Sequence, residues 1–482
     1  MPMTPPENAA IVITAAVSGG AAVLGLVWWF GVTPPQRLEL RMPDTEPIAE
    51  RSSSSPAIVI KGQFAEFGGI ASDLPGSWPR FRGTDFSNVC KDSMPLADGW
   101  GPEGPDVLWS VEMGEGYAGP AVHNGRVYVL DYDEEERADA LRCFSLADGQ
   151  EIWRRWYAVS VKRNHGMSRT VPAVTDRFVV TVGPKCHVMC VDAVSGEFLW
   201  GIDLVKEYDA EVPLWYTGQC PLIDGKTAVI APGGSALLIG VDCESGEVLW
   251  RTPNTDGWQM SHSSVMPMQF GDERMFVYCA IGGMVGVRAD GPTAGSVVWK
   301  TTAWKHAVVA PSPVFLPDGR IFVTAGYGVG SKMLRLADTG DGLNIEELYS
   351  MTREEFACEQ QTPVYYAGHL FSVLPKDGGA LKGQLVCIAP DGTRKWNSGK
   401  ADRFGLGPFL VADDKLLVMD DDGVLTMVRA ETSSYAKLAQ ARVLTGRDAW
   451  GPMALVEGLL LCRDSNRMIC LDLREASGGG DG

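Results

Sequence analysis

Asp192-Ala-Val-Ser-Gly-Glu-Phe-Leu-Trp200 returns further along the chain as Asp242-Cys-Glu-Ser-Gly-Glu-Val-Leu-Trp250. Each copy joins a tight Asp-to-Gly turn to a short strand that ends in tryptophan. Less regular copies end at Trp153, Trp299 and Trp396, so the tryptophans follow one another at about 50 residues or twice that interval. A repeat of this length indicates small β units that must pack on one another, because no unit can bury both of its faces alone.

A second pattern predicts the number of units. Eight times, a proline precedes a short apolar run, a tight turn and a β-rich strand. The eight prolines are Pro120, Pro172, Pro221, Pro267, Pro313, Pro363, Pro408 and Pro452. Several of the turns are Asn-Gly or Asp-Gly pairs, such as Asn124-Gly125 and Asp318-Gly319, which are strong hairpin signals. The pattern predicts an all-β fold, an eight-bladed β-propeller of four-stranded blades.

The eighth unit has no tryptophan strand after it. Val107-Leu108-Trp109, which lies ahead of the first proline, has the composition of the missing strand. We therefore expect this N-terminal strand to complete the last blade, which closes the ring and leaves no open sheet edge.

Composition excludes one class of partner. The chain has 42 basic and 60 acidic residues and a formal net charge of −18, so it lacks the basic face that a nucleic acid requires. Eleven cysteines are spread through the repeats without the spacing of a disulfide framework. Cys186 and Cys190, with His187 between them, would be half of a zinc site, but no second Cys/His pair has matching spacing, and no metal site is predicted. A disulfide between these two neighbours stays open.

The N-terminus differs in kind from the repeats. Residues 1–8 form a short tail, and residues 9–32 are 24 residues without a charge, long enough for a transmembrane helix. Residues 33–75 are rich in proline, serine and charge and predict a flexible tether. Residues 76–475 carry the propeller, and residues 476–482 are a glycine-rich tail for which we expect disorder.

From Trp78 to Leu473 the sequence resembles the pyrroloquinoline-quinone-like (PQQ-like) eight-bladed propellers. The resemblance rests on the turn-to-tryptophan cassettes ending at Trp200 and Trp250. It also rests on Trp78-Pro-Arg-Phe-Arg-Gly83, a segment similar to one that opens membrane-anchored or secreted bacterial members of unassigned function. Members of this superfamily include quinone-dependent dehydrogenases and an outer-membrane assembly scaffold, both of which work outside the cytoplasm. The resemblance therefore implies a single-pass protein of the bacterial cytoplasmic membrane with a periplasmic propeller, although Arg37 and Arg41 after the apolar stretch weakly favour the opposite orientation.

Candidate ligand-binding residues precede the eight prolines. In a propeller these positions lie where each innermost strand begins, so we expect their side chains to converge on the central funnel. The candidates are His165, Arg169, Tyr216, Gln219, His262, Ser263, Lys305, His306, Glu359, Gln360, Arg403, Asp448 and Trp450. Tyr117, Trp215, Gln361, Ser261 and Phe404 occupy equivalent positions.

Each of these candidates has a structural alternative. The aromatic residues also suit packing between blades, and the cations also suit the surface of an acidic protein, where Glu359 and Asp448 would pair with them. The repeat tryptophans are different, because we expect them on outer strands in purely structural roles. They are Trp109, Trp153, Trp200, Trp250, Trp299 and Trp396.

Three functions are compatible with this sequence. The first is a membrane-anchored propeller that binds a small anionic or carbonyl-rich ligand or holds a protein partner. The second, implied by the resemblance, is a quinone-dependent dehydrogenase with PQQ and calcium in the funnel. The chain lacks the vicinal cysteine pair of those enzymes, and their calcium ligands and catalytic aspartate match no motif here, so the sequence favours a protein that is not an enzyme. The third, a hydrolase-like site built on Glu359 and Asp448, rests on two acids alone.

Overall fold

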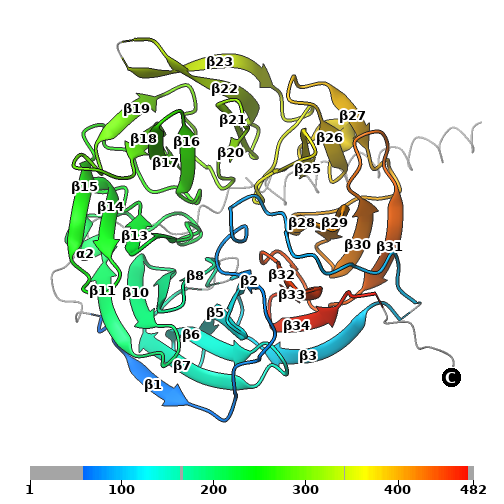
Figure 1. Cartoon of the computed structure of the whole chain (residues 1–482), viewed down its shortest axis with the longest axis horizontal. Helices are drawn as coiled ribbons and strands as arrows, with labels where there is room; N and C mark the ends of the chain where they lie inside the picture. The colour runs from blue at the N-terminus through cyan, green and yellow to red at the C-terminus, as the bar shows by residue number, and fades with distance from the viewer. Residues whose placement is uncertain (1–57, 102, 163–166, 341, 476–482) are drawn as a thin grey trace, which may run out of the picture. The chain divides into compact units, whose positions relative to one another are not determined.

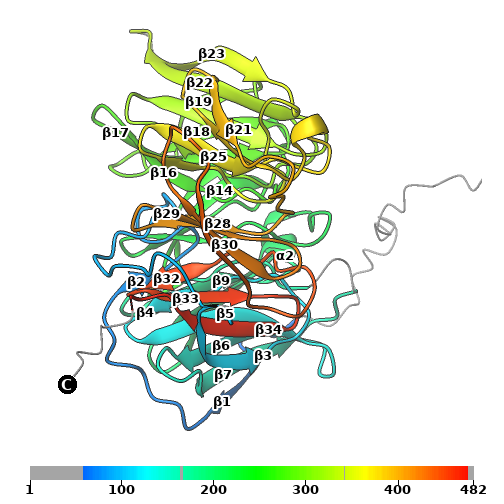
Figure 2. The ribbon, with the colours of Figure 1, turned by 90° about the vertical axis from the view of Figure 1, so that its right-hand side faces the viewer.

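Eight antiparallel sheets are arranged around a central axis in the computed structural model (Figure 1). The structure describes residues 58–101, 103–162, 167–340 and 342–475, which lie in a unit spanning Ala57–Gly482. Figure 2 shows the same sheets from the side. The predicted eight-bladed all-β propeller is confirmed.

The first four blades follow the chain. Blade 1 contains β4 (Ala121–His123), β5 (Arg126–Asp133), β6 (Ala138–Ser145) and β7 (Glu151–Ala158). Blade 2 contains β8 (Ala173–Val174), β9 (Phe178–Val182), β10 (His187–Asp192) and β11 (Phe198–Asp203), and the short helix α2 (Leu204–Tyr208) follows it. Blade 3 contains β12 (Leu222–Asp224), β13 (Thr227–Ile230), β14 (Ala236–Asp242) and β15 (Val248–Pro253). Blade 4 contains β16 (Met266–Phe270), β17 (Glu273–Ala280), β18 (Gly283–Arg288) and β19 (Val297–Thr301).

The remaining blades complete the ring. Blade 5 contains β20 (Val314–Phe315), β21 (Arg320–Ala325), β22 (Gly330–Asp338) and β23 (Leu343–Met351). Blade 6 contains β24 (Val364–Tyr366), β25 (His369–Val373), β26 (Leu385–Ile388) and β27 (Arg394–Asn397), with a 3₁₀ turn, η2 (Gly379–Leu381), between β25 and β26. Blade 7 contains β28 (Phe409–Ala412), β29 (Lys415–Met419), β30 (Val424–Arg429) and β31 (Lys437–Arg442). Blade 8 contains β32 (Ala454–Val456), β33 (Leu459–Arg463), β34 (Arg467–Asp472) and β3 (Asp106–Glu112).

The prolines mark the innermost strands, as the sequence pattern indicates. Pro120, for example, comes directly before β4, and Pro363 directly before β24. Except in blade 1, where β2 (Ser77–Trp78) pairs with β4, an innermost strand is a sheet edge with no ladder partner on one side, so a residue without an N–H group is tolerated there. The middle strands are buried on both faces, as all five residues of β9 show, because neighbouring blades cover both sides.

Each repeat tryptophan described next packs on the turn of the following blade. Trp153 of blade 1 donates its indole N–H to the carbonyl oxygen of Val194 in blade 2 at 3.1 Å, and Trp200 of blade 2 donates to that of Cys243 in blade 3 at 2.9 Å. The ring of Trp200 lies so close to Gly246 (φ +76°) that a Cβ on this glycine would lie 2.6 Å from it. Glycine is required there for the left-handed backbone and for the close approach.

We expect Trp200→Ala to lower the free energy of unfolding by about 3–5 kcal/mol, the usual cost of removing a large buried aromatic side chain. Chemical denaturation followed by circular dichroism measures this loss. Leu249→Ala, in the next copy of the cassette, is the control, because Leu249 is 53% exposed and its loss should change stability by about 0.5 kcal/mol or less. Equal losses in the two variants would contradict the docking role.

The predicted closure by Val107-Leu108-Trp109 is confirmed. Strand β3 pairs with β34, and Trp109 donates its indole N–H to the carbonyl oxygen of Leu146 in blade 1 at 2.9 Å. Blade 8 therefore takes its outermost strand from the N-terminal part of the chain. It is joined to blade 1 by the same kind of tryptophan contact that joins blade 1 to blade 2 and blade 2 to blade 3.

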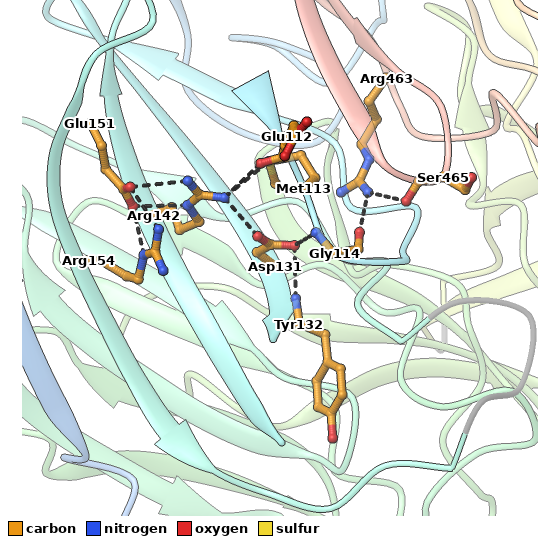
Figure 3. A network of polar contacts seen from close by, with 10 residues as sticks. All are labelled: Glu112, Met113, Gly114, Asp131, Tyr132, Arg142, Glu151, Arg154, Arg463 and Ser465. Carbon is orange, nitrogen blue, oxygen red and sulfur yellow. Dashed lines mark hydrogen bonds and ion pairs between the residues drawn. The ribbon is translucent and has the colours of Figure 1, made fainter. Parts of the chain in front are cut away.

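A polar network reinforces this junction (Figure 3). Arg142 of β6 donates to the carbonyl oxygen of Glu112 in β3 at 3.0 Å and to the carboxylate of Asp131 at 2.9 Å. Asp131 in turn accepts the amide of Gly114 at 2.8 Å. Arg463 of β33 donates to the carbonyl oxygen of Gly114 at 3.0 Å. The loop at Gly114 is thus held by Asp131 of blade 1 and by Arg463 of blade 8.

We expect Arg142→Met to destabilise the fold by about 3–5 kcal/mol, because the nearly buried Asp131 carboxylate would lose its partner. Arg177→Met is the matched control, since the Arg177–Glu244 ion pair is exposed at 57% and 51% and should contribute about 1 kcal/mol at most. Urea unfolding of both variants gives the comparison. An Arg142→Met variant as stable as the control would show that the network does not secure the closure.

Two corrections concern the segment before the first blade. Residues 58–75 were predicted to belong to the tether, yet Gln63–Glu66 forms strand β1 on the outer edge of blade 1, and Ile60 is buried. Ser77–Trp78 forms strand β2, which pairs with β4 on the inner edge. Blade 1 therefore has six strands instead of four. The predicted tether was too long, because its proline and serine lie mostly before residue 58, whereas Ile58, Ile60 and Phe64 belong to an apolar stretch that packs on blade 1.

The predicted membrane span, residues 9–32, lies outside the described residues, as do residues 1–8, the tether up to residue 57 and the tail 476–482. Within the described part of the chain, no helix is long and apolar enough to cross a membrane.

Candidate functional site

A cavity of about 340 Å³ lies at the end of the ring where the chain enters the innermost strands. It is lined by Phe81, Tyr117, Arg169, Trp215, Gly218, Cys220, His262, Ser264, Val308, Ala310, Tyr327, Glu359, Gln360, Gln361, Lys376, Leu406, Trp450 and Pro452. These residues come from the entries to all eight blades, from connections within blades 5 and 6, and from the segment between β2 and β3, which is the arrangement expected of a funnel on the propeller axis.

The segment between β2 (Ser77–Trp78) and β3 passes over the centre of the ring (Figure 1), and Phe81 of this segment lines the cavity. Arg82 is buried and donates to the carbonyl oxygens of Thr362 at 2.9 Å and Pro363 at 3.0 Å in blade 6. Arg80 donates to the carbonyl oxygen of Ile223 in blade 3 at 3.2 Å. Burial lowers the pKa of Arg82 to about 9, so the side chain is still a cation at neutral pH. These bonds fix Phe81 against the cavity.

One wall of the cavity is a pair of aromatic rings, tilted by 38° to one another, with a cation beside each ring. The rings of Tyr117 and Trp450 lie 5.1 Å apart between centroids. The Arg169 guanidinium lies 5.6 Å from the Tyr117 ring, and the Lys376 ammonium lies 5.8 Å from the Trp450 ring. Cations at such distances from aromatic faces are attracted by the ring quadrupole, so each helps to position the other.

A second aromatic group lines the same cavity. Trp215 stacks on Tyr327 with centroids 5.7 Å apart and an interplanar angle of 18°, and its ring lies 6.1 Å from that of His262. Trp215 and Tyr327 both have left-handed backbone conformations, with φ of 64° and 55°. Such conformations are costly in residues with large side chains and are found preferentially at functional sites.

Burial changes the acidity of the cavity groups. It lowers the pKa of Arg169 to about 10, so this side chain is a cation at neutral pH. Burial, with the nearby Arg169 charge, lowers the pKa of His262 to about 4, which leaves a neutral ring that can accept or donate a hydrogen bond. Burial also raises the pKa of Glu359, an effect that Lys376 opposes. The site thus combines two cations with one carboxyl group, against the charge of the whole chain.

The structure brings five of the sequence candidates together on the cavity wall. They are Arg169, His262, Glu359, Gln360 and Trp450, and Tyr117, Trp215 and Gln361 join them from the equivalent positions. His165 lies outside the described residues.

Three candidates close to the rim do not line the cavity. Gln219 is fully buried and bonds to both main-chain groups of Ala231, at 2.9 and 2.8 Å, so it holds blade 3 together. Ser263 is fully buried within blade 4, and so is Ser261, whose hydroxyl accepts the Ser263 amide. The Tyr216 hydroxyl donates to the carbonyl oxygen of Lys162 at 2.7 Å. Successive side chains of an extended segment point in opposite directions, so a residue next in sequence to one that lines the cavity points into the blade.

Four other candidates are also placed elsewhere, as is Phe404, which is buried in the core. Lys305 is exposed, and the His306 ring packs edge-on against Trp304 at 4.4 Å. Arg403 donates to main-chain oxygens of the β25–β26 connection. Asp448 is not part of the cavity lining, and its carboxylate accepts a hydrogen bond from the Tyr117 hydroxyl at 3.5 Å.

Three aromatic or charged cavity residues escaped the sequence analysis. Tyr327 and Lys376 lie in connections between the second and third strands of blades 5 and 6, and Phe81 lies in the segment before blade 1. In an antiparallel blade these connections open at the same end as the entries to the innermost strands. Strand alternation could therefore have identified Tyr327 and Lys376, whereas the path of Phe81 across the channel has no signature in the repeats.

The cavity does not fit a calcium ion. Calcium takes six to eight oxygen ligands with several carboxylates, and Glu359 is the one carboxyl group among the lining residues, close to Lys376. Among the described residues, no group of three or more His, Cys, Asp or Glu side chains is placed to hold a metal ion. The eleven cysteines all lie in the described residues and form no disulfide there, including Cys186 and Cys190.

Comparison with known proteins supports the fold. A family model described as outer membrane protein assembly factor BamB matches residues 136–333. The crystal structure of BamB from Moraxella catarrhalis is 12% identical, with a TM-score of 0.51, and covers 76% of this chain and 99% of its own. The computationally designed Ika8 protein gives 11% identity, a TM-score of 0.50 and the same coverages. A europium-containing methanol dehydrogenase gives 11% identity and a TM-score of 0.44, over 82% of this chain and 89% of its own. The search of curated proteins gives no match. The expected resemblance to PQQ-like eight-bladed propellers is confirmed.

Proposed function

We propose that this propeller is a ligand-binding module whose central cavity takes a planar, anionic small molecule. The observation that carries the proposal is the tilted pair of rings, Tyr117 and Trp450, with Arg169 beside the first ring and Lys376 beside the second. Aromatic faces favour a flat ligand, and the two cations favour carboxylate or carbonyl groups at its edges.

The size and the polarity of the cavity are consistent with this class of ligand. Its volume of about 340 Å³ lies at the lower end of the usual range for small-molecule sites. Trp215 and Tyr327 add apolar area, and the neutral His262 and the amides of Gln360 and Gln361 add hydrogen-bonding groups of either sense. A sugar would need more hydroxyl-binding groups, and a cationic ligand would meet Arg169 and Lys376.

A quinone such as PQQ is one molecule of this chemical class, being flat and rich in carboxylate and carbonyl groups. The aromatic and cationic residues suit that molecule, but the donor set does not suit the calcium ion expected beside it. We therefore propose binding without assigning a redox reaction, and PQQ is used below as a probe.

We expect Arg169→Ala to weaken binding of such a ligand by about 1.5–3 kcal/mol, the contribution of a hydrogen bond to a charged group. This corresponds to about one to two orders of magnitude in Kd. Quenching of tryptophan fluorescence by PQQ and by a panel of aromatic carboxylates measures the affinity. Arg403→Ala is the matched control, since Arg403 bonds to main-chain oxygens away from the cavity, and it should bind like the native protein.

Absence of ligand binding would favour the protein-scaffold function instead. If no quinone, aromatic carboxylate or sugar raises the melting temperature, the cavity does not bind ligands of these classes. A role as a protein scaffold, which the name of the BamB family model suggests, would then be the better hypothesis.

We also propose that residues 9–32 anchor the protein in a bacterial cytoplasmic membrane with the propeller on the periplasmic side. The support is the length of this uncharged stretch and the extracytoplasmic location of the superfamily members named above. We expect the full chain in the membrane fraction, with a propeller that protease degrades in spheroplasts and not in intact cells. A chain without residues 9–32 should leave the membrane fraction, and protection of the full chain in spheroplasts would reverse the orientation.

A further inference from the structure

Asp139 is a buried carboxyl group below the rim of the cavity. It lies on β6 of blade 1, is 1% exposed, and faces blade 2. Its two oxygens accept hydrogen bonds from the hydroxyl of Tyr157 at 2.9 Å and from that of Ser168 at 3.0 Å. Gly183 of blade 2 lies close to both Tyr157 and Asp139. A Cβ on this glycine would lie 2.5 Å from the Asp139 carboxylate and even closer to the Tyr157 hydroxyl.

Ser168 connects this carboxyl group to the cavity wall. Its carbonyl oxygen accepts the amide of Tyr117 at 2.7 Å, and the next residue in the chain is Arg169. The Arg169 guanidinium lies over the Tyr117 ring. Ser168 therefore positions both Tyr117, through its carbonyl oxygen, and Arg169, its neighbour in the chain. The Ser168 side chain is in turn held by Asp139.

No cation compensates the Asp139 carboxylate in the described part of the chain, where none of the ion pairs includes it. The groups that face it are Tyr157 on β7, Ser168 from blade 2, and Asp131 on β5, whose charge opposes ionisation of Asp139. His187, which packs edge-on against Tyr157 at 5.4 Å, is neutral near pH 7, since burial lowers its pKa to about 4. Burial raises the pKa of Asp139 itself to about 7.

The cost of this arrangement suggests a use. An aspartate in the interior of a β-strand is disfavoured, and a buried polar pair can often be replaced by apolar residues of similar shape without loss of stability. Packing alone would therefore be served by an apolar residue at position 139.

We propose that Asp139 is a positioning residue that couples loss of its proton to the placement of Tyr117 and Arg169 in the cavity. An ionised carboxylate has no proton of its own, so both hydroxyls must donate to it, and Ser168 is fixed by a charge-assisted hydrogen bond. A protonated carboxyl group needs an acceptor for its own proton and holds Ser168 less firmly. Anion affinity then rises as the pH rises through neutrality, an extension that rests on the proposed function.

The coupling can be tested without any ligand. Hydrogen exchange of the Tyr117 amide, corrected for the intrinsic rate, should slow by about tenfold between about pH 6 and pH 8 in the native protein. Asp139→Asn should abolish this change, and so should Ser168→Ala, which removes the link and leaves the carboxyl group in place. Exchange that is independent of pH in the native protein, or that keeps its pH dependence in Ser168→Ala, would overturn the proposal.

Thermal stability reports the titration of Asp139 separately. Because the folded pKa lies above the unfolded value, the folded state binds the proton more tightly, and this group's contribution to stability is lost as pH rises toward 7. The native Tm should therefore fall relative to that of Asp139→Asn between about pH 5 and pH 8. Ser168→Ala should keep a fall of this kind. Tyr157→Phe removes a hydrogen bond to the charged form, so the pKa of Asp139 should rise further and the fall in Tm should continue to higher pH. A constant Tm difference would show that Asp139 does not titrate in this range.

Binding of PQQ is the last measurement. Its affinity should increase across the same pH range in the native protein and stay flat in Asp139→Asn and Ser168→Ala. If PQQ does not bind while the exchange of Tyr117 follows pH, the proposed ligand class is wrong and the positioning role of Asp139 stands. If PQQ binds with a pH dependence that both variants retain, the binding function stands and the role of Asp139 is refuted.

Discussion

A tryptophan ring packed on a glycine of the neighbouring turn is the contact on which the ring of blades depends. Trp109 lies on Gly149, Trp153 on Gly196, and in each case a Cβ would lie 2.7 Å from the indole. The glycine also provides the positive φ that closes the turn, so one residue sets both the turn and the spacing between blades. Because a β-blade cannot bury its faces alone, this spacing determines whether eight of them close into a ring.

The cavity inherits its geometry from that closure. Tyr117 lies between β3 of blade 8 and β4 of blade 1, and Trp450 lies between β31 of blade 7 and β32 of blade 8. This pair of rings therefore lies at the junction of blades 8 and 1, which Trp109 of β3 and the Arg142 network secure. The distance between the Arg169 and Lys376 charges is set by the ring as a whole and not by any one loop, which is how a rigid scaffold places distant residues in one site.

The sequence predicted the backbone of this protein better than its side chains. Regular spacing of prolines and tryptophans is enough to count blades and to identify β3 as the closing strand, because both follow from the need to bury sheet faces. The same spacing places Gln219 at the rim beside the cavity but cannot show that its amide turns inward to Ala231. Arg403 is an equally instructive case, since its long side chain reaches main-chain oxygens outside the funnel. Residues 58–75 were assigned to the tether because they follow its Pro- and Ser-rich part, although the apolar Ile58, Ile60 and Phe64 indicate a packed segment.

The participation of β3 in blade 8 also has a consequence for folding. Asp106 of β3 is paired with Asp472 of β34. Strand β3 is made early in synthesis and cannot pair until β34 has been made, close to the end of synthesis. Until then the facing flanks of blades 1 and 8 are uncovered, and Arg82 likewise gains its carbonyl partners only when Thr362 and Pro363 of blade 6 have been made. Pairings of such long sequence separation are slow to form and expose sheet edges while they are incomplete. The chain should therefore be most vulnerable to aggregation and proteolysis in the interval just before its last blade emerges from the ribosome.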